Sequence, residues 1–104
     1  MRPRYRYIQF RVVSQKRRSR SEVFEAIQRT TVSTYGVSGF AEILPTLQSF
    51  DEDTQEGTLR CTRLRVVEMR ASLSLIHEIR GDKTAFHVTG LSGTIKALGV
   101  HQKT

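Results

Sequence analysis

The sequence predicts an α/β (α+β) sandwich of the ferredoxin-like or RRM-like kind, with an antiparallel sheet, two main helices on one face and a C-terminal helical stub. Three observations predict it. Apolar and polar residues alternate over residues 5–13, apolar residues recur at helical spacing over 67–79, and a polar hairpin loop at 51–57 separates two strand-like segments. The resulting order is β-α-β-β-α-β in a single domain, residues 1–104, whose helices bury apolar stripes against the sheet.

The predicted first strand has two different faces. Its apolar face, expected to be buried, carries Ile8, Phe10 and Val12. Its opposite face carries Tyr5, Tyr7, Gln9 and Arg11. Aromatic side chains interleaved with arginine can stack RNA bases and hold phosphates. The alternative is that the tyrosines pack under a helix or against a partner protein, and the sequence leaves both interpretations open.

A helix is expected to begin after this strand and a basic loop. Ser19 and Glu22 stand at capping-box spacing. The apolar stripe that follows consists of Val23, Phe24 and Ile27. The helix is expected to end between Thr30 and Tyr35, because the threonine-rich run has poor helix propensity and Gly36 offers a stop.

The middle of the chain predicts a hairpin. Residues 37–44 can be a short helix or a strand and are closed by Pro45. Residues 46–50 are expected to form a strand, and residues 58–65 to return as a second strand. On that second strand one face would carry Leu59, Cys61, Arg63 and Arg65.

The strongest helical pattern lies at residues 67–79, stopped by Gly81. Its stripe, widened by Leu73 and Ile76, consists of Val67, Ala71, Leu75 and Ile79. Leu75 is accordingly expected to be buried between this helix and the sheet. A last strand at 84–89 would turn Phe86 and Val88 toward the core.

The sequence Gly90-Leu91-Ser92-Gly93-Thr94 then predicts a turn that opens the helical stub. A hydroxyl of Ser92 or Thr94 could cap that stub. Free backbone N–H groups at a helix N-terminus can bind a phosphate. The alternative is a glycine-containing connection with no ligand.

Basic residues outnumber acidic ones and gather in two segments. The chain has 17 Lys+Arg against 10 Asp+Glu and a formal net charge of +7. Residues 1–20 contain eight basic groups and no acid, and residues 58–70 contain four arginines and one acid. Because both segments overlap predicted strands, which hold side chains at fixed spacing, the pattern favours a polyanionic partner, most often nucleic acid.

The compartment is expected to be intracellular. The one cysteine, Cys61, cannot form an internal disulfide, which fits a reducing environment. No apolar run has the length of a signal peptide or a membrane span. The place within the cell depends on the source: the cytoplasm for an archaeon, the nucleus or nucleolus for a eukaryote.

No catalytic or metal-binding constellation is recognisable. The histidines show no i,i+4 pair, and Cys61 has no nearby thiol. The main acid cluster lies in a solvated loop, and P-loop, dinucleotide-binding and nucleophile-elbow motifs are missing. We therefore expect neither catalytic residues nor a metal site.

The segments resemble, in order and spacing, the Pop-five family of protein subunits of ribonuclease P and ribonuclease MRP. The resemblance covers nearly the whole chain and rests on Arg6–Phe10, Glu56–Cys61, Ala71–Ile76 with Gly81, and Gly90–Lys96. Its most specific parts are the Arg60-Cys61 step after a glycine-initiated strand and the Ser-Gly-Thr-Ile-Lys ending.

The resemblance implies a non-catalytic subunit that binds the catalytic domain of the ribonuclease P RNA. It implies no cofactor on the protein, since the Mg²⁺ ions belong to the RNA, which removes the 5′ leader from precursor tRNA. Implied partners are that RNA, a TIM-barrel-like protein subunit, other ribonuclease P proteins and, indirectly, precursor tRNA, with no membrane. The expected RNA-binding residues are Arg4, Arg6, Arg11, Lys16, Arg17, Arg18, Arg60, Arg63 and Lys96.

Of these, Arg4 to Arg18 are expected to form one electropositive arm or edge. Lys96 is expected to approach Arg60 and Arg63 if their strands are neighbours. The alternative function is a stand-alone RRM-like or ribosomal RNA-binding protein. An RRM would carry aromatic residues on its third strand, where residues 58–65 have none. A third class, a small-molecule regulatory domain of the same shape, would usually be nearly neutral.

Overall fold

The chain alternates strands and helices in the predicted order, with one additional short strand. The computed structural model describes residues 4–93. In chain order the elements are β1 (Tyr5–Ser14), α1 (Arg20–Ile43), β2 (Thr46–Asp51), β3 (Glu56–Thr62), the 3-10 turn η1 (Arg63–Arg65), α2 (Val66–Leu75), β4 (Glu78–Ile79) and β5 (Asp82–Ser92). The strand that the sequence did not predict is β4, and the predicted C-terminal stub lies outside the described residues.

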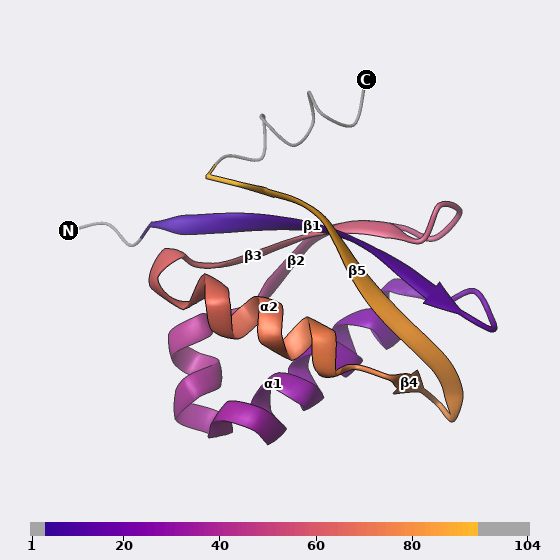
Figure 1. Ribbon diagram of the computed structural model, residues 1–104, viewed down its shortest axis with the longest axis horizontal. Coiled ribbons are helices and arrows are strands. Elements are labelled where there is room, and N and C mark those ends of the chain that lie inside the picture. The colour runs from indigo at the N-terminus through magenta and orange to yellow at the C-terminus, as the bar shows by residue number, and fades with distance from the viewer. Residues whose placement is uncertain (1–3, 94–104) are drawn as a thin grey trace.

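The strands form a five-stranded antiparallel sheet in the order β2-β3-β1-β5-β4. β1 therefore lies in the middle, paired with β3 along one edge and with β5 along the other. The crossovers through α1 and α2 place both helices on the same face of the sheet (Figure 1). This split β-α-β arrangement confirms the predicted ferredoxin-like sandwich. No helix of the described part is both long and apolar enough to cross a membrane.

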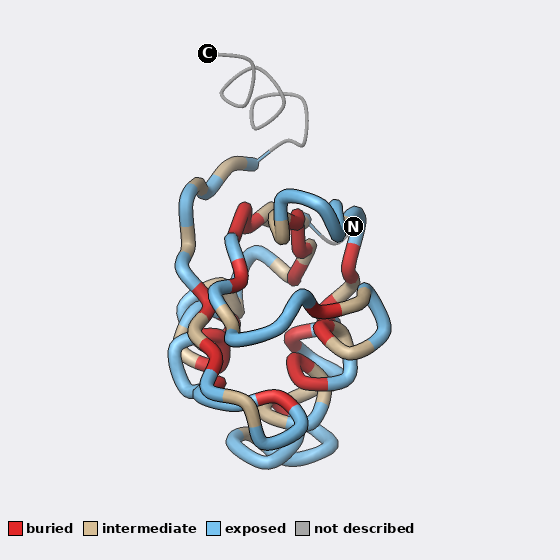
Figure 2. The backbone as a smooth tube through the Cα atoms, turned by 90° about the vertical axis from the view of Figure 1, so that its right-hand side faces the viewer, coloured by how far each residue is buried: buried red, intermediate tan, exposed pale blue. Residues whose placement is uncertain are grey.

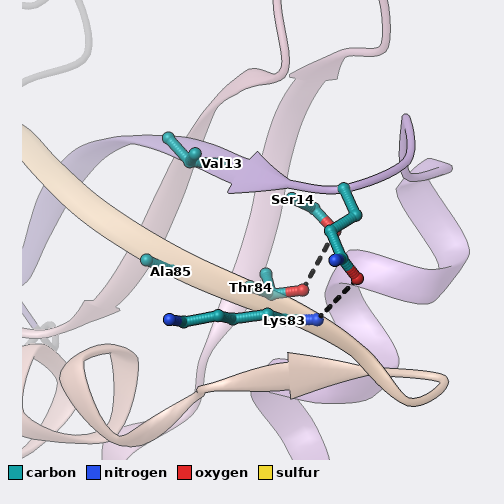
Figure 3. Close-up of a pocket in the computed structure, with 6 residues that line it drawn as sticks. Val13, Ser14, Lys83, Thr84 and Ala85 are labelled. Atoms are coloured by element: carbon teal, nitrogen blue, oxygen red, sulfur yellow. Dashed lines mark hydrogen bonds between the residues drawn. The ribbon is translucent and has the colours of Figure 1, made fainter.

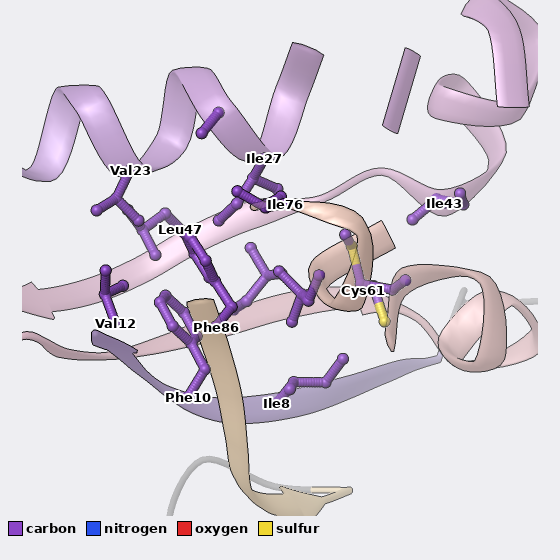
Figure 4. Close-up of a cluster of buried hydrophobic side chains, with 14 of the residues drawn as sticks. Ile8, Phe10, Val12, Val23, Ile27, Ile43, Leu47, Cys61, Ile76 and Phe86 are labelled. Carbon is purple, nitrogen blue, oxygen red and sulfur yellow. The ribbon is translucent and has the colours of Figure 1, made fainter. Parts of the chain in front are cut away.

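The core forms between the sheet and the helices, and β1 supplies its centre. Ile8 and Phe10 are 0% exposed and Val12 is nearly so, which confirms the predicted buried face. The ring of Phe10 stacks on that of Phe86 with 5.4 Å between centroids. Figure 4 shows Val23 of α1 pointing toward this aromatic pair. Buried positions are interspersed with exposed ones along the tube in Figure 2, and the connecting loops are largely exposed.

Gly57 on β3 makes room for this packing. A Cβ at Gly57 would lie 2.9 Å from the ring of Phe10, 2.9 Å from that of Phe50 and 2.8 Å from the Ser49 carbonyl oxygen. Since neither the backbone nor the two rings can give way cheaply, only glycine fits at this position of the hairpin.

α1 begins as predicted and is interrupted where a stop was predicted. The Ser19 hydroxyl accepts from the Glu22 backbone N–H, and the Glu22 carboxylate accepts from the Ser19 N–H, which confirms the capping box. The first part of α1 continues through the threonine-rich run, where Thr31 is buried and donates its hydroxyl to the Ile27 carbonyl at 2.7 Å. Gly36, with φ 76° and ψ 176°, is non-helical and ends this first part at a kink, which confirms the predicted stop; residues 37–43, left open by the sequence, form a second helical part.

α2 is shorter than predicted, and its buried stripe is only partly the predicted one. It ends at Leu75, and the chain continues extended into β4, where Ile79 is buried. Val67 and Leu75 are 73% and 52% exposed, so the prediction that Leu75 lies in the core is wrong. Leu73 and Ile76 of the predicted stripe are buried, together with Met69 and Ser72, which the sequence analysis did not assign to it.

Two strand boundaries also differ from prediction. β3 ends at Thr62 because residues 63–65 turn into η1, so Arg63 and Arg65 do not share a strand face with Leu59. β5 runs on to Ser92, and Gly90, Leu91 and Ser92 pair with β1. These three residues therefore belong to a strand and not to the predicted turn that could bind a phosphate. Any such turn would have to follow Gly93, outside the described residues.

The revised packing of α2 predicts that Leu73→Ala lowers the free energy of unfolding by about 2–5 kcal/mol, because it truncates a buried leucine and leaves a cavity. Leu75→Ala, the matched control on the exposed side, should change it by about 0.5 kcal/mol or less. Chemical denaturation of both variants measures the difference. A larger cost for Leu75→Ala would place the other side of α2 against the sheet.

Candidate nucleic-acid interface

The cations assigned to RNA from the sequence lie in two groups near opposite ends of β1, and not on one arm. Because β1 has ten residues, the groups are about 30 Å apart. The first group, which we call the arginine end, consists of Arg4, Arg6, Arg60 and Arg63. The second, in the loop after β1, consists of Lys16, Arg17 and Arg18. Arg11 lies between them on β1, and Lys96 lies outside the described residues.

Strand pairing assembles the arginine end. The Arg63 backbone N–H donates to the Arg4 carbonyl at 2.8 Å, so the end of β3 lies against the start of β1. Arg60 is directly opposite Tyr7 in the register of these two strands. The condition for the predicted approach of Lys96 was that the strand of Arg60 neighbours the strand leading toward Lys96, and it is not met, because β1 separates β3 from β5.

Arg60 is held in place by an aromatic ring. Its guanidinium carbon lies 4.3 Å from the centroid of Tyr5, a cation–π contact. Its Nε is buried and has no hydrogen-bond partner within the described structure. Among the described residues no acid forms a salt bridge with Arg4, Arg6, Arg60 or Arg63. The charge of the arginine end is therefore not neutralised by a salt bridge within the described residues, and Arg4 and Arg63 are exposed.

The second group lies beside the acidic hairpin loop between β2 and β3. Arg17 pairs with Asp53 at 3.2 Å, with side chains 65% and 86% exposed. The Arg20 backbone N–H donates to Glu52 at 2.9 Å, which holds the same loop against the start of α1. An ion pair as exposed as Arg17–Asp53 contributes little to stability, so Arg17 can exchange its partner. Lys16 is exposed as well.

Arg18, which the sequence analysis placed in the electropositive arm, is buried. Its side chain is only 4% exposed and forms ion pairs with Glu22 and Asp82. Its Nε donates to the Ser14 hydroxyl at 3.2 Å. The Gln55 amide accepts from the Arg18 N–H and donates to the Arg18 carbonyl, both at 2.9 Å. Arg18 therefore joins the ends of β1, α1, β5 and the hairpin, and its guanidinium is committed within the protein.

Nucleophilic and metal chemistry find no support in residues 4–93. Burial raises the pKa of the Cys61 thiol to about 11, so the thiol is protonated at neutral pH. Within that range no three His, Cys, Asp or Glu side chains are grouped as metal ligands. The arrangement is suited to binding an anion rather than to bond-making chemistry.

A surface pocket of about 330 Å³ opens where β1 ends and β5 begins (Figure 3). Val13 and Ala85 face each other across the two strands, and the Ser14 and Thr84 hydroxyls lie 3.0 Å apart. Sequence analysis did not identify this pocket, because only the strand register brings together residues so distant along the chain. It adjoins the second cation group, because Ser14, which lines it, accepts a hydrogen bond from Arg18.

The fold and the cation groups define a small basic α/β sandwich, and comparisons with known proteins then place it. The model of the Rpp14/Pop5 family matches residues 6–100. The chain is 42% identical over 98 residues to ribonuclease P protein component 2 of Pyrococcus furiosus, covering 94% of this chain and 82% of that protein. The protein of the same name from Thermococcus gammatolerans is 41% identical with the same coverage.

A solved structure agrees in fold. A chain in the cryo-EM structure of yeast ribonuclease MRP matches with a TM-score of 0.71 at 10% sequence identity, over 99% of this chain and 94% of that chain. The protein described here belongs to the Rpp14/Pop5 family. This confirms the resemblance to the Pop-five family that the sequence motifs indicated.

The burial of Arg18 predicts opposite outcomes for two adjacent arginines. Arg18→Ala should lower the free energy of unfolding by about 3 kcal/mol, because it removes a buried cation from two carboxylates, of which Glu22 keeps Arg80 as a partner. Arg17→Ala, the matched control, should leave it nearly unchanged. Thermal and chemical denaturation test both, and equal stability of the two variants would contradict the assignment of Arg18 to the interior.

The capping box predicts a pH dependence. The hydrogen bond from the Ser19 backbone N–H, helped by Arg18, by the Ser19 hydroxyl and by Arg80, outweighs partial burial and lowers the pKa of Glu22 below its ordinary 4.5. Glu22 thus adds stability that is complete above the ordinary value and is lost as the pH falls through the lowered one. Glu22→Gln should therefore lose less unfolding free energy than wild type on acidification below about pH 4.5. Denaturation across that range would show an unchanged slope if Glu22 does not contribute.

Proposed function

We propose that this chain is a non-catalytic protein subunit of ribonuclease P that binds the catalytic domain of the ribonuclease P RNA. In that role it stabilises the conformation in which the RNA removes the 5′ leader from precursor tRNA. The observation that carries the proposal is the similarity of 94% of the chain to proteins named ribonuclease P protein component 2. The net charge of +7 supports an RNA partner.

The physical task of the chain is to neutralise phosphates. A folded RNA brings phosphates close together, and their repulsion is relieved either by Mg²⁺ held on the RNA or by protein cations. Arg4, Arg11 and Arg63 are exposed and form no salt bridge within the described residues, so they are free to make such contacts. Each contact releases counterions and adds to affinity.

Protein partners are part of the same proposal: a TIM-barrel-like subunit and the other ribonuclease P proteins. The outward side of α2 supports them. Leu64 before the helix, and Val67 and Leu75 on it, are exposed apolar side chains in the part of the structure where the sequence predicted a buried stripe. Surfaces of this kind usually meet another protein.

Reconstitution tests the function. The ribonuclease P RNA, assembled with its other protein subunits, should cleave precursor tRNA at a lower Mg²⁺ concentration when the chain is present than when it is omitted. The chain alone, rigorously freed of RNA, should not cleave. Cleavage by the RNA-free chain, or an unchanged Mg²⁺ requirement, would overturn the proposal.

The phosphate contacts predict a change in salt dependence. Arg63→Ala and Arg11→Ala should each weaken binding to the ribonuclease P RNA and flatten the slope of log affinity against log salt by about 0.9 or less. Arg29→Ala is the matched control, because Arg29 lies on α1 and pairs with Glu25 at 2.7 Å. Filter binding at several salt concentrations measures the slopes, and identical slopes for all three variants would remove the phosphate assignment.

A further inference from the structure

One face of the sheet is covered by no helix within residues 4–93. Both helices pack on the other face (Figure 1). The central row of this open face belongs to β1 and consists of Tyr5, Tyr7, Gln9, Arg11 and Val13. The alternative that Tyr5 and Tyr7 pack under a helix is therefore wrong for the described helices, and both rings are half-buried on the open side.

Tyr5 and Arg60 form a pre-organised pair on this face. The guanidinium of Arg60 lies over the ring of Tyr5, and Tyr7 is opposite Arg60 on the neighbouring strand. The Nε–H of Arg60 is buried with no acceptor in the described structure. A buried donor without a partner costs free energy, and an acceptor that reached it would recover this cost.

The residues next to this pair have small side chains and include no acids. Gly90 and Ser92 of β5 flank β1 here, and Thr46 of β2 lies opposite Arg60, so no bulky side chain rises beside Tyr7 from these positions. The acidic residues that the register places on this face, Asp51 and Glu56, lie at the far end of β3, in the row of Arg11. These flanking positions therefore present neither a bulky side chain nor like charge to a flat, negatively charged ligand, although Gln9 and Thr58 farther along the same face are buried.

We propose that Tyr5, Tyr7 and Arg60 form a binding site for an unpaired RNA nucleotide. Its base stacks on the ring of Tyr7, and its phosphate or a base oxygen accepts from Arg60. The identity of the ligand rests on the proposed function, and what is added is that the contact is with a single strand. A base inside a duplex is already stacked on both faces, whereas an unpaired base offers a face to an aromatic side chain or to a guanidinium plane.

The test measures binding of the full chain to two RNAs of equal length at the same salt concentration, an oligouridine and a blunt duplex. Tyr7→Leu keeps an apolar side chain on the strand and removes the aromatic face, and Tyr7→Phe is its matched control. Tyr7→Leu should lose about tenfold in affinity for oligouridine and little for the duplex, and Tyr7→Phe should behave as wild type. Arg60→Lys should also weaken oligouridine binding, because lysine keeps the charge but not the planar group.

A second readout separates contact from stability. Oligouridine containing 4-thiouridine should crosslink under ultraviolet light to Tyr5 or Tyr7, and melting temperatures of all variants should stay near that of wild type. Crosslinks confined to the loop at Lys16 and Arg17, or equal oligouridine affinities for Tyr7→Leu and Tyr7→Phe, would overturn the site.

The site and the proposed function fail separately. The site fails while the function stands if the chain stimulates the reconstituted ribozyme but Tyr7→Leu and Tyr7→Phe bind oligouridine equally. The function fails while the site stands if Tyr7→Leu loses oligouridine affinity but wild type does not stimulate the ribozyme.

Discussion

The double pairing of β1 is the constraint on which the rest of the structure depends. Both edges of this strand are hydrogen-bonded, to β3 and to β5, so it has no freedom to shift. Because side chains alternate along a strand, the register that buries Ile8 and Phe10 necessarily presents Tyr5 and Tyr7 on the opposite face. The core and the candidate RNA face are thus fixed by the same set of backbone hydrogen bonds.

Arginines close in sequence differ in exposure and in ion pairing because their surroundings differ. Arg17 is exposed and makes one weak pair, whereas Arg18 is enclosed by two carboxylates and a hydroxyl. Arg65, close to Arg63 in sequence, pairs with both Glu42 and Glu68, and these contacts raise the pKa of Arg65 above its ordinary value. Arg63 has no such pair among the described residues. Net charge alone therefore overstates the cations that a ligand can reach.

Local signals in the sequence predicted the local features of the fold. Alternation predicted the buried face of β1, and the spacing of Ser19 and Glu22 predicted the start of α1. The predictions that failed concerned features that depend on residues far away in the sequence. Arg18 is buried because Asp82, 64 residues away, lies beside it. On α2 the predicted stripe was too wide: Leu73 and Ile76 are buried against the core, whereas Val67 and Leu75 are exposed. β5 passes through Gly90 because β1 pairs with it there, which overrides the turn preference of glycine.

The acidic hairpin loop makes the distribution of charge along β1 asymmetric. Gln55 and Arg20 hold this loop against the end of β1, so its acids offset the charge of Lys16 and Arg17 there. At the opposite end of the strand, Arg4, Arg60 and Arg63 have no such compensation within the described chain. A field of this shape turns the protein as it diffuses toward a polyanion, so that the tyrosine-bearing end arrives first. Fixing the loop thus sets the orientation of encounter as well as the shape of the fold.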